Sequence, residues 1–164
     1  MLHNKLQDHN IILASGSPRR QQFFKELGLD FKIRLKPVDE VYPQGLQGSE
    51  IACFLSKLKA IPFEGKLEPN EILVTSDTVV WHNKKSLAKA VDSDEAVQML
   101  KTLSGEWHEV ITAVSFTTSK NQNTVHHITK VKFKDFTDDE IHHYVATFKP
   151  FDKAGAYGIQ EWIG

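Results

Sequence analysis

Two neighbouring arginines occupy the position in this sequence that points most directly to chemistry. Arg19 and Arg20 follow a Ser-Pro pair that is typical of a helix N-terminus, so both guanidinium groups fall in the first helical turn. Cations oppose the helix dipole at that end, whereas anions are favoured by the free N–H groups there. The arginines therefore indicate a site for an anion such as a polyphosphate. The alternative is a pair of solvated arginines on a surface helix.

Asp77 is the second candidate, because it lies within a segment that is apolar at both odd and even positions, 72–81 (ILVTSDTVVW). Such a segment predicts a central strand that is covered on both faces. A carboxylate buried there costs several kcal/mol unless it is paired, binds a metal or faces a cleft. This cost favours a role such as general base over the alternative, in which residues 76–78 form a turn between two strands.

Three further charged residues complete a chemically coherent set. Glu40 follows an expected strand, Lys59 lies at the edge of an apolar helical stripe, and Lys89 ends a short expected strand. Each is a weak signal alone, because charged residues in such places are usually solvated. Together with the arginines and Asp77 they supply what phosphoryl transfer needs, with carboxylates that hold a divalent metal and cations that neutralise phosphate oxygens.

Composition limits the class of protein. The chain has 164 residues, 40% hydrophobic and 25% charged, which is ordinary for a globular domain with a sizeable core. A formal net charge of -1 argues against a broad nucleic-acid surface. Cys53 is the single cysteine, so an internal disulfide is excluded. No apolar run has membrane-spanning length and the N-terminus has no signal-peptide pattern, so we expect a cytoplasmic protein without membrane contact.

Hydrophobic periodicity predicts a mixed α/β fold with both hairpins and crossover connections. In the first helix, Phe23, Phe24 and Leu27 recur at helical spacing, and Gly28 is placed to end it. The glycine-rich segment 152–160 has no Walker-type spacing, so a ligand loop and a connecting loop remain open. The expected strands are 11–14, 31–35, 72–81, 86–89, 110–116 and 124–136, and the expected helices are 17–27, 49–61, 92–103 and 137–148.

Four motifs, in order, resemble the Maf family of nucleotide pyrophosphatases. They are LASGSPRR (13–20), SDTVV (76–80), LSGEWHEVITAV (103–114) and FDKAGAYGIQ (151–160), and the resemblance extends from Ile11 to Gly164. It implies a single domain over residues 1–164 with a mixed twisted sheet, flanking helices and two lobes around a nucleotide cleft, similar to the inosine triphosphate pyrophosphatase architecture. It also implies a house-cleaning hydrolase of acid anhydrides that uses Mg²⁺ or Mn²⁺ and releases a nucleoside monophosphate and pyrophosphate.

The resemblance assigns roles to residues at matching positions. Asp77 matches the proton acceptor, and Glu40 and Asp77 together match the acidic metal-binding positions. Arg19, Thr78 and Gln160 match the residues that mark the dTTP/UTP subfamily, including enzymes that act on modified pyrimidine nucleotides. The phosphate-binding positions are matched by Ser15, Arg19, Arg20, Lys59 and Lys89.

Two departures and two alternatives accompany the resemblance. Lys89 is followed by Ala90 where the family usually has proline, which predicts a less rigid loop around Lys89. The chain ends at Gly164 where family members continue with further strand and helix, so the domain is expected to be short at its C-terminus. A homodimer is compatible with the family. A non-catalytic nucleotide-binding regulator of cell division and septum formation is the alternative function, and a general phosphate-binding domain is a third.

Overall fold

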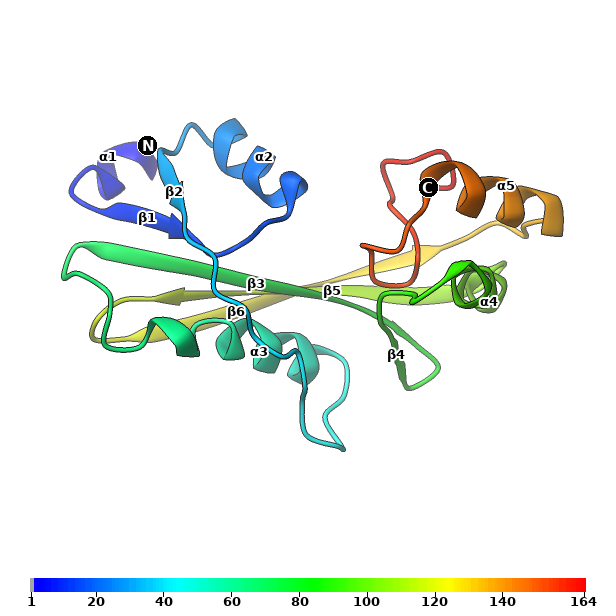
Figure 1. Ribbon diagram of the computed structural model, residues 1–164, viewed down its shortest axis with the longest axis horizontal. Coiled ribbons are helices and arrows are strands. Elements are labelled where there is room, and N and C mark those ends of the chain that lie inside the picture. Colours follow the sequence, from blue (N-terminus) through cyan, green and yellow to red (C-terminus); the bar gives the residue numbers. More distant parts are fainter. Residues whose placement is uncertain (1) are drawn as a thin grey trace. The chain divides into compact units, whose positions relative to one another are not determined.

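The computed structural model describes residues 2–164 and forms a mixed α/β fold (Figure 1). No helix within these residues is long and apolar enough to cross a lipid bilayer. The elements in chain order are α1 (Leu2–Leu6), β1 (Asn10–Leu13), α2 (Pro18–Glu26), β2 (Phe31–Ile33), α3 (Ser49–Leu58), the 3₁₀ turn η1 (Ile61–Phe63), β3 (Glu71–His82), β4 (Lys85–Leu87), α4 (Ser93–Leu103), β5 (Trp107–Thr117), β6 (Gln122–Lys132) and α5 (Asp138–Phe148).

The strands form a six-stranded sheet in the order β2-β1-β3-β5-β6, with β4 paired to β3. Strand β1 is parallel to both neighbours, and Ile11 lies opposite Phe31 on one side and Ile72 on the other. Strands β3 and β4 are antiparallel, with Val80 opposite Leu87. Helix α2 supplies the crossover that a parallel β1–β2 pair requires. The predicted mixed sheet with flanking helices is therefore confirmed.

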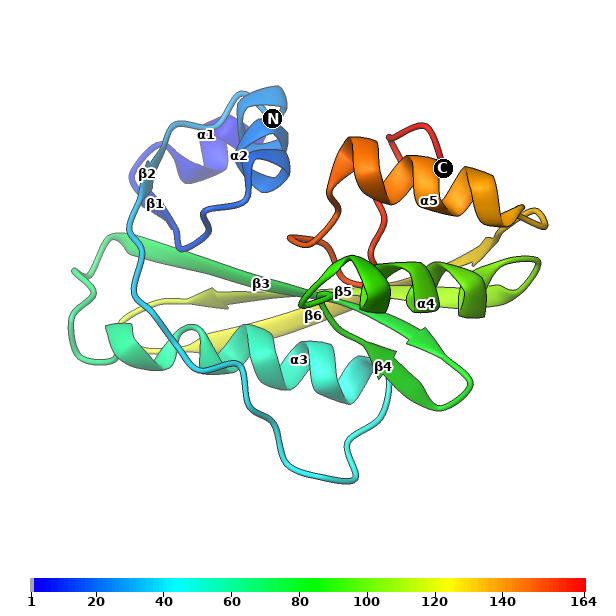
Figure 2. The ribbon, with the colours of Figure 1, turned by 45° about the vertical axis from the view of Figure 1, so that its right-hand side comes forward.

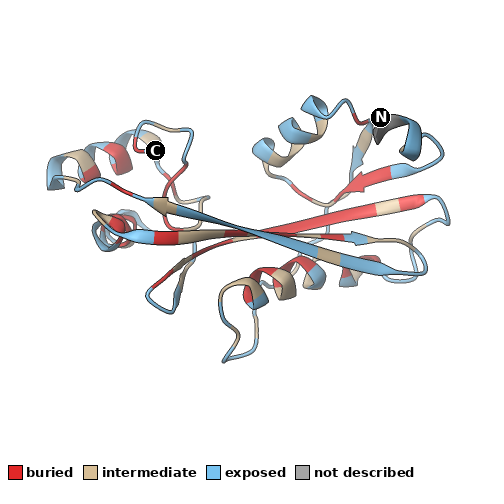
Figure 3. Cartoon of the chain, turned by 180° about the vertical axis from the view of Figure 1, so that it is seen from behind, coloured by how far each residue is buried: buried red, intermediate tan, exposed pale blue. Residues whose placement is uncertain are grey.

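Strand β3 is continuous through Asp77, so the alternative turn at residues 76–78 is wrong. Leu73 and Thr75 are fully buried on one face, and Val74 is 3% exposed on the other. Figure 3 shows this strand coloured mostly as buried, whereas β6 is mostly exposed. Coverage on both faces is what the uninterrupted apolar sequence predicts for a central strand.

Helix α2 begins at Pro18 and is followed by Gly28 at φ +66°, as the sequence predicts, but two of the three apolar side chains at helical spacing are exposed. Phe23 and Leu27 are 56% and 59% exposed, and no residue of α2 is buried. Only Phe24 packs inward, with its ring 5.5 Å from that of Phe31. Strand β2 has three residues, so it covers only a small part of the apolar side of α2.

The fold divides into two compact units. Unit 1 comprises Met1–Leu46, Glu50–Asp77 and Ala113–His126, and unit 2 comprises Gln47–Ser49, Thr78–Thr112 and His127–Gly164. The core of unit 2 gathers around α4 and α5, which lie side by side (Figure 2). Both helices begin as predicted: Asp92 accepts a hydrogen bond from the Glu95 N–H, and Thr137 forms a reciprocal capping box with Glu140.

Candidate active site

Unit 1 brings together three of the charged residues that the sequence singles out. The Lys59 ammonium lies 2.5 Å from Oδ1 of Asp77 and 3.1 Å from Oε1 of Glu40. The Lys59 side chain is 19% exposed and that of Asp77 is 9% exposed. One ammonium thus bridges a buried carboxylate and a half-exposed one, which makes this cluster the polar centre of the unit.

Strand alternation explains why Asp77 points toward Lys59. Leu73 and Asp77 share a parity on β3, so their side chains lie on the same face. On that face Leu73 packs against Ala60 and Phe63, which follow α3 directly. Lys59 lies between the end of α3 and this apolar contact, so its flexible stem brings the ammonium to Asp77.

Burial dominates the electrostatics of Asp77. Loss of solvent raises the pKa of the Asp77 carboxyl above its ordinary value, and the nearby Glu40 carboxylate acts in the same direction. The Lys59 ammonium and the Arg20 guanidinium oppose that shift. A carboxylate with a raised pKa is a stronger proton acceptor, which suits the general-base role that the sequence predicts.

Ser15 accepts the hydrogen bonds that close the turn before α2. Its hydroxyl oxygen accepts hydrogen bonds from the Ser17 N–H at 3.2 Å and from the Arg20 guanidinium at 3.5 Å, and its carbonyl accepts from Gln21 at 3.3 Å. Ser17 occupies the N-cap position, as the sequence predicts, but its side chain makes no capping bond. Ser15 is 6% exposed, which fixes this turn against the sheet.

The two arginines differ in their surroundings. Arg19 is exposed, whereas Arg20 is half-buried and faces the carboxylates of Asp77 and Glu40. Burial lowers the pKa of Arg20, and the two carboxylates oppose that effect, so its guanidinium stays charged. The first turn of α2 holds no acidic residue. A helix N-terminus with these two cations is suited to bind a phosphate group.

The remaining predicted residues belong to unit 2. Thr78 lies with its hydroxyl 3.1 Å from that of Thr112. Lys89 pairs with Ala154 in an antiparallel bridge, and the Gly155 N–H donates to the Leu87 carbonyl at 3.0 Å. The segment around Lys89 is thus held by backbone bonds to the glycine-rich segment, although proline is absent after Lys89. Sequence reasoning missed this pairing because a single bridge leaves no periodic signal.

Gln160 is exposed, and the residues on both sides of it are anchored in unit 2. The Tyr144 hydroxyl accepts a hydrogen bond from the Gly158 N–H at 3.1 Å and donates one to Glu161. Glu161 also pairs with Lys153 at 3.1 Å. The glycine-rich segment is therefore a tethered loop that presents Gln160, rather than a free connection.

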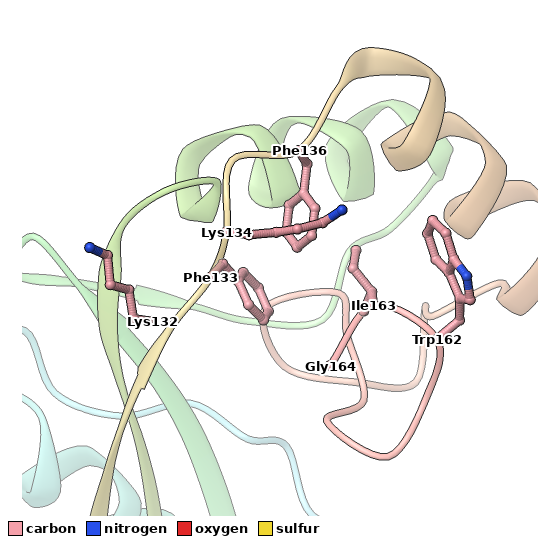
Figure 4. A pocket seen from close by; sticks show the side chains of 7 residues that line it. All are labelled: Lys132, Phe133, Lys134, Phe136, Trp162, Ile163 and Gly164. Carbon is pink, nitrogen blue, oxygen red and sulfur yellow. The ribbon is translucent and has the colours of Figure 1, made fainter.

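A pocket in unit 2 contains none of the predicted site residues. Figure 4 shows it between the chain segment after β6 and the last residues of the chain. Its lining residues are Lys132, Phe133, Lys134, Phe136, Trp162, Ile163 and Gly164. None of these lining residues belongs to the Lys59 cluster of unit 1.

The donor set for a metal ion is limited to two carboxylates. Within residues 2–164 no three His, Cys, Asp or Glu side chains gather in a group that could hold a metal. Mg²⁺ is commonly bound by one or two protein carboxylates together with substrate phosphates and water. Asp77 and Glu40 share one cation in Lys59, so their oxygens fit such a partial site.

The fold and the site combine a mixed sheet, a cationic strand-to-helix turn and a buried aspartate that is paired with a lysine. The Maf-like protein family model matches residues 10–164, so the chain is a member of that family, and the resemblance seen in the sequence is confirmed. A Flavobacterium johnsoniae protein named dTTP/UTP pyrophosphatase is 58% identical over 164 residues, covering 100% of this chain and 84% of that protein.

Other relatives agree with this assignment. A Bacteroides fragilis protein of the same name is 46% identical over 165 residues, covering 100% of this chain and 85% of that protein. Among solved structures, the Staphylococcus aureus Ham1 protein has a TM-score of 0.50 at 13% identity, covering 77% of this chain and 72% of that one. That likeness supports the fold alone.

Proposed function

We propose that this protein is a nucleoside triphosphate pyrophosphatase that hydrolyses dTTP and UTP to the nucleoside monophosphate and pyrophosphate. The observation that carries the proposal is the Lys59 ammonium between Asp77 and Glu40, in the unit that also holds the cationic turn at Arg20. The names of relatives that match the whole length of this chain support the substrate class. Removal of non-standard pyrimidine nucleotides is the corresponding house-cleaning role.

The reaction breaks the anhydride bond between the α and β phosphates with one water molecule. In our proposal, Asp77 accepts a proton from the attacking water, because its burial raises its pKa toward the working range of a base. Arg20 and Lys59 neutralise charge that develops on the phosphate oxygens. Ser15 holds the turn that presents Arg20, and Arg19 adds a second cation at the same helix terminus.

A divalent ion, Mg²⁺ or Mn²⁺, would be held by Asp77 and Glu40. When bound, it supplies further positive charge to the phosphate oxygens. The side chains of Asp77 and Glu40 are already brought together by Lys59, so they need little rearrangement to share a cation.

Substrate choice is proposed for residues that the family resemblance marks. Arg19, Thr78 and Gln160 would distinguish the pyrimidine nucleotide, and Lys89 would contact a phosphate. The tethered loop that presents Gln160 supports this, because a specificity residue must be held in place to discriminate between bases. A screen of nucleoside triphosphates tests the assignment, with dTTP and UTP expected to have the highest kcat/KM.

The direct experiment compares the wild-type protein with Asp77→Asn in an assay for released pyrophosphate, using dTTP with Mg²⁺ or Mn²⁺. We expect release by the wild type and its loss in Asp77→Asn. Asp8→Asn is the matched control, because Asp8 is an exposed aspartate of the same unit. Equal turnover by Asp77→Asn would remove Asp77 from its role as base. Nucleotide binding by calorimetry without pyrophosphate release would contradict the enzymatic function.

A further inference from the structure

A buried threonine on β3 completes the last turn of α3. The Thr75 side chain is fully buried, and its hydroxyl donates a hydrogen bond to the Ser56 carbonyl at 2.6 Å. The neighbouring carbonyls of that turn, those of Leu55 and Lys57, accept from the N–H groups of Lys59 and Ala60 at 3.1 and 2.9 Å. Thr75 thus satisfies a helix-end carbonyl from a different element, in the way that capping residues usually do from the same chain segment.

The side chain of Ser56 takes part in a separate chain of hydroxyl groups. The Ser56 hydroxyl donates to the Cys53 carbonyl at 3.0 Å and lies 2.8 Å from the Ser115 hydroxyl, which lies 2.8 Å from that of Thr124. Each hydroxyl has one proton to donate, so the direction runs from Thr124 through Ser115 to Ser56. All of these residues belong to unit 1. These hydrogen-bonded hydroxyl groups connect α3 to β5 and β6 near Ser56.

The Thr75–Ser56 hydrogen bond is close in sequence to both members of the Lys59–Asp77 ion pair. Thr75 lies two residues before Asp77 on the same face of β3, and Ser56 lies one helical turn before Lys59. Apolar packing of α3 on the sheet is non-directional and would tolerate sliding of the helix. A buried hydrogen bond has a defined geometry and leaves costly unsatisfied groups when it is broken. The Thr75 bond therefore sets the position from which the Lys59 ammonium reaches Asp77.

We propose that Thr75, through its bond to the Ser56 carbonyl, is a positioning residue that holds Lys59 against Asp77. The proposal rests on the proposed function for its effect on turnover, but the geometry that it describes stands apart from any activity. Thr75 donates a hydrogen bond from its hydroxyl to the Ser56 carbonyl, so its effect is exerted through the register of α3 against β3. Its hydroxyl, rather than its volume, is the group that matters.

The first test replaces the hydroxyl with a methyl group. Thr75→Val keeps the shape of the side chain, and we expect kcat for dTTP to fall about tenfold with KM changed less than about twofold, because misplacement of a catalytic group affects turnover strongly. Thr75→Ser keeps the hydroxyl and should retain at least about half of the wild-type kcat on the same grounds. Thr102→Val is the matched control, since Thr102 makes the same kind of bond, to the Gln98 carbonyl of α4 at 2.9 Å, on an exposed helix face of unit 2.

A second test asks whether Thr75 acts through Lys59. In a Lys59→Met background, Thr75→Val should cause no further loss of kcat, because the group that it positions is gone. If Thr75→Val instead lowers kcat by the same factor in both backgrounds, its effect is a general structural one and the proposal is overturned.

A third test needs no catalysis and separates failure of this proposal from failure of the proposed function. Acylation of lysines by a reagent in limiting amount, followed by mass spectrometry, reports how firmly each ammonium is held. In the wild type Lys59 should be among the least reactive lysines, and in Thr75→Val its labelling rate should rise several-fold, with Thr75→Ser and Thr102→Val unchanged. Unchanged Lys59 labelling in a folded Thr75→Val protein overturns the proposal, even when the wild type is an active pyrophosphatase.

Discussion

The Lys59 ammonium lies 2.5 Å from the Asp77 carboxylate and 3.1 Å from that of Glu40, so a single cation serves two acidic groups. Such a pair is costly to break on one side, because the Asp77 carboxylate then stays buried without the ammonium to which it is hydrogen-bonded. The consequences differ for stability and for activity, and both can be measured.

Lys59→Met is expected to lower the free energy of unfolding by about 3 kcal/mol at neutral pH, in the range found when one partner of a buried ion pair is removed. The pKa of Asp77 should also rise further, because burial and the Glu40 charge then act without the opposing ammonium. Urea denaturation measures the first effect. The control is Lys66→Met, since Lys66 is exposed and its ammonium donates to the Pro62 carbonyl at 2.9 Å without an ion pair to a carboxylate of the described residues, so its loss should change stability little.

Ser15 and Ser17 form a natural pair of variants, because Ser17 occupies the N-cap position without a side-chain bond, whereas the Ser15 hydroxyl makes the bonds of this turn. Ser15→Ala removes the acceptor for the Ser17 N–H and for the Arg20 guanidinium, and should cost about 1 kcal/mol of stability. It should also raise KM for dTTP, because Arg20 loses a contact that orients it. Ser17→Ala removes no capping bond and should stay within about 0.5 kcal/mol of the wild type. Equal effects of the two substitutions would contradict this assignment.

Local signals in the sequence were sufficient where a residue and its partner lie close in the chain. The capping box at Thr137 and Glu140 is an example. The apolar sequence of β3 likewise predicted a strand that is buried on both faces and contains Asp77. Periodicity at Phe23 and Leu27 predicted the helix correctly, but it does not tell whether another element covers the apolar face, and both side chains are exposed.

Contacts across the sequence could not be predicted from periodicity. Lys59 reaches Asp77 through a side chain at a helix end, and Lys89 is held by a single backbone bridge to Ala154. The family resemblance named these residues as a set, but only the folded chain gives Lys59 its two acidic partners. The hydroxyl of Thr75 carried no signal in the sequence, since threonine is ordinary within a strand.

Gly155 should be sensitive to substitution because it combines a left-handed backbone with a close neighbour. Its φ is +68°, and an added Cβ would lie 3.0 Å from both methyl groups of Val80. Gly65 has the same φ with nothing within 4 Å, so Gly65→Ala measures the backbone strain alone, at about 1 to 2 kcal/mol. Gly155→Ala should cost more than that, as measured by thermal unfolding.

The same substitution should affect turnover, because the Gly155 N–H bonds to the Leu87 carbonyl beside Lys89. We expect Gly155→Ala to raise KM for dTTP, whereas Gly65→Ala leaves it unchanged. An unaltered KM in a stably folded Gly155→Ala protein would show that the backbone pairing does not position Lys89.

His108 makes the stability of unit 2 depend on pH. It is 3% exposed, its Nε2 lies 2.7 Å from the Tyr157 hydroxyl, and its ring packs edge-on against Phe133. The pKa of His108 is lowered from 6.5 to about 4, mainly by burial and also by the nearby His82, while the Glu106 backbone acts in the opposite direction. The folded protein therefore keeps this imidazole neutral through most of the range in which an unfolded chain protonates it.

Between about pH 6.5 and about pH 4 the unfolded state binds a proton at His108 that the folded state does not. The stability contributed by His108 is thus fully present above about pH 6.5 and is lost as the pH falls toward 4, by up to roughly 3 kcal/mol at about 1.4 kcal/mol per pKa unit. His108→Gln cannot titrate, so its free energy of unfolding should fall less over this interval than that of the wild type, as measured by urea denaturation at several pH values. His127→Gln, at an exposed histidine of the same unit, should reproduce the wild-type slope. If His108→Gln and the wild type lose stability in parallel, the acid sensitivity of the protein originates in its carboxylates instead, among which Glu71 has a lowered pKa through its hydrogen bonds with Arg34.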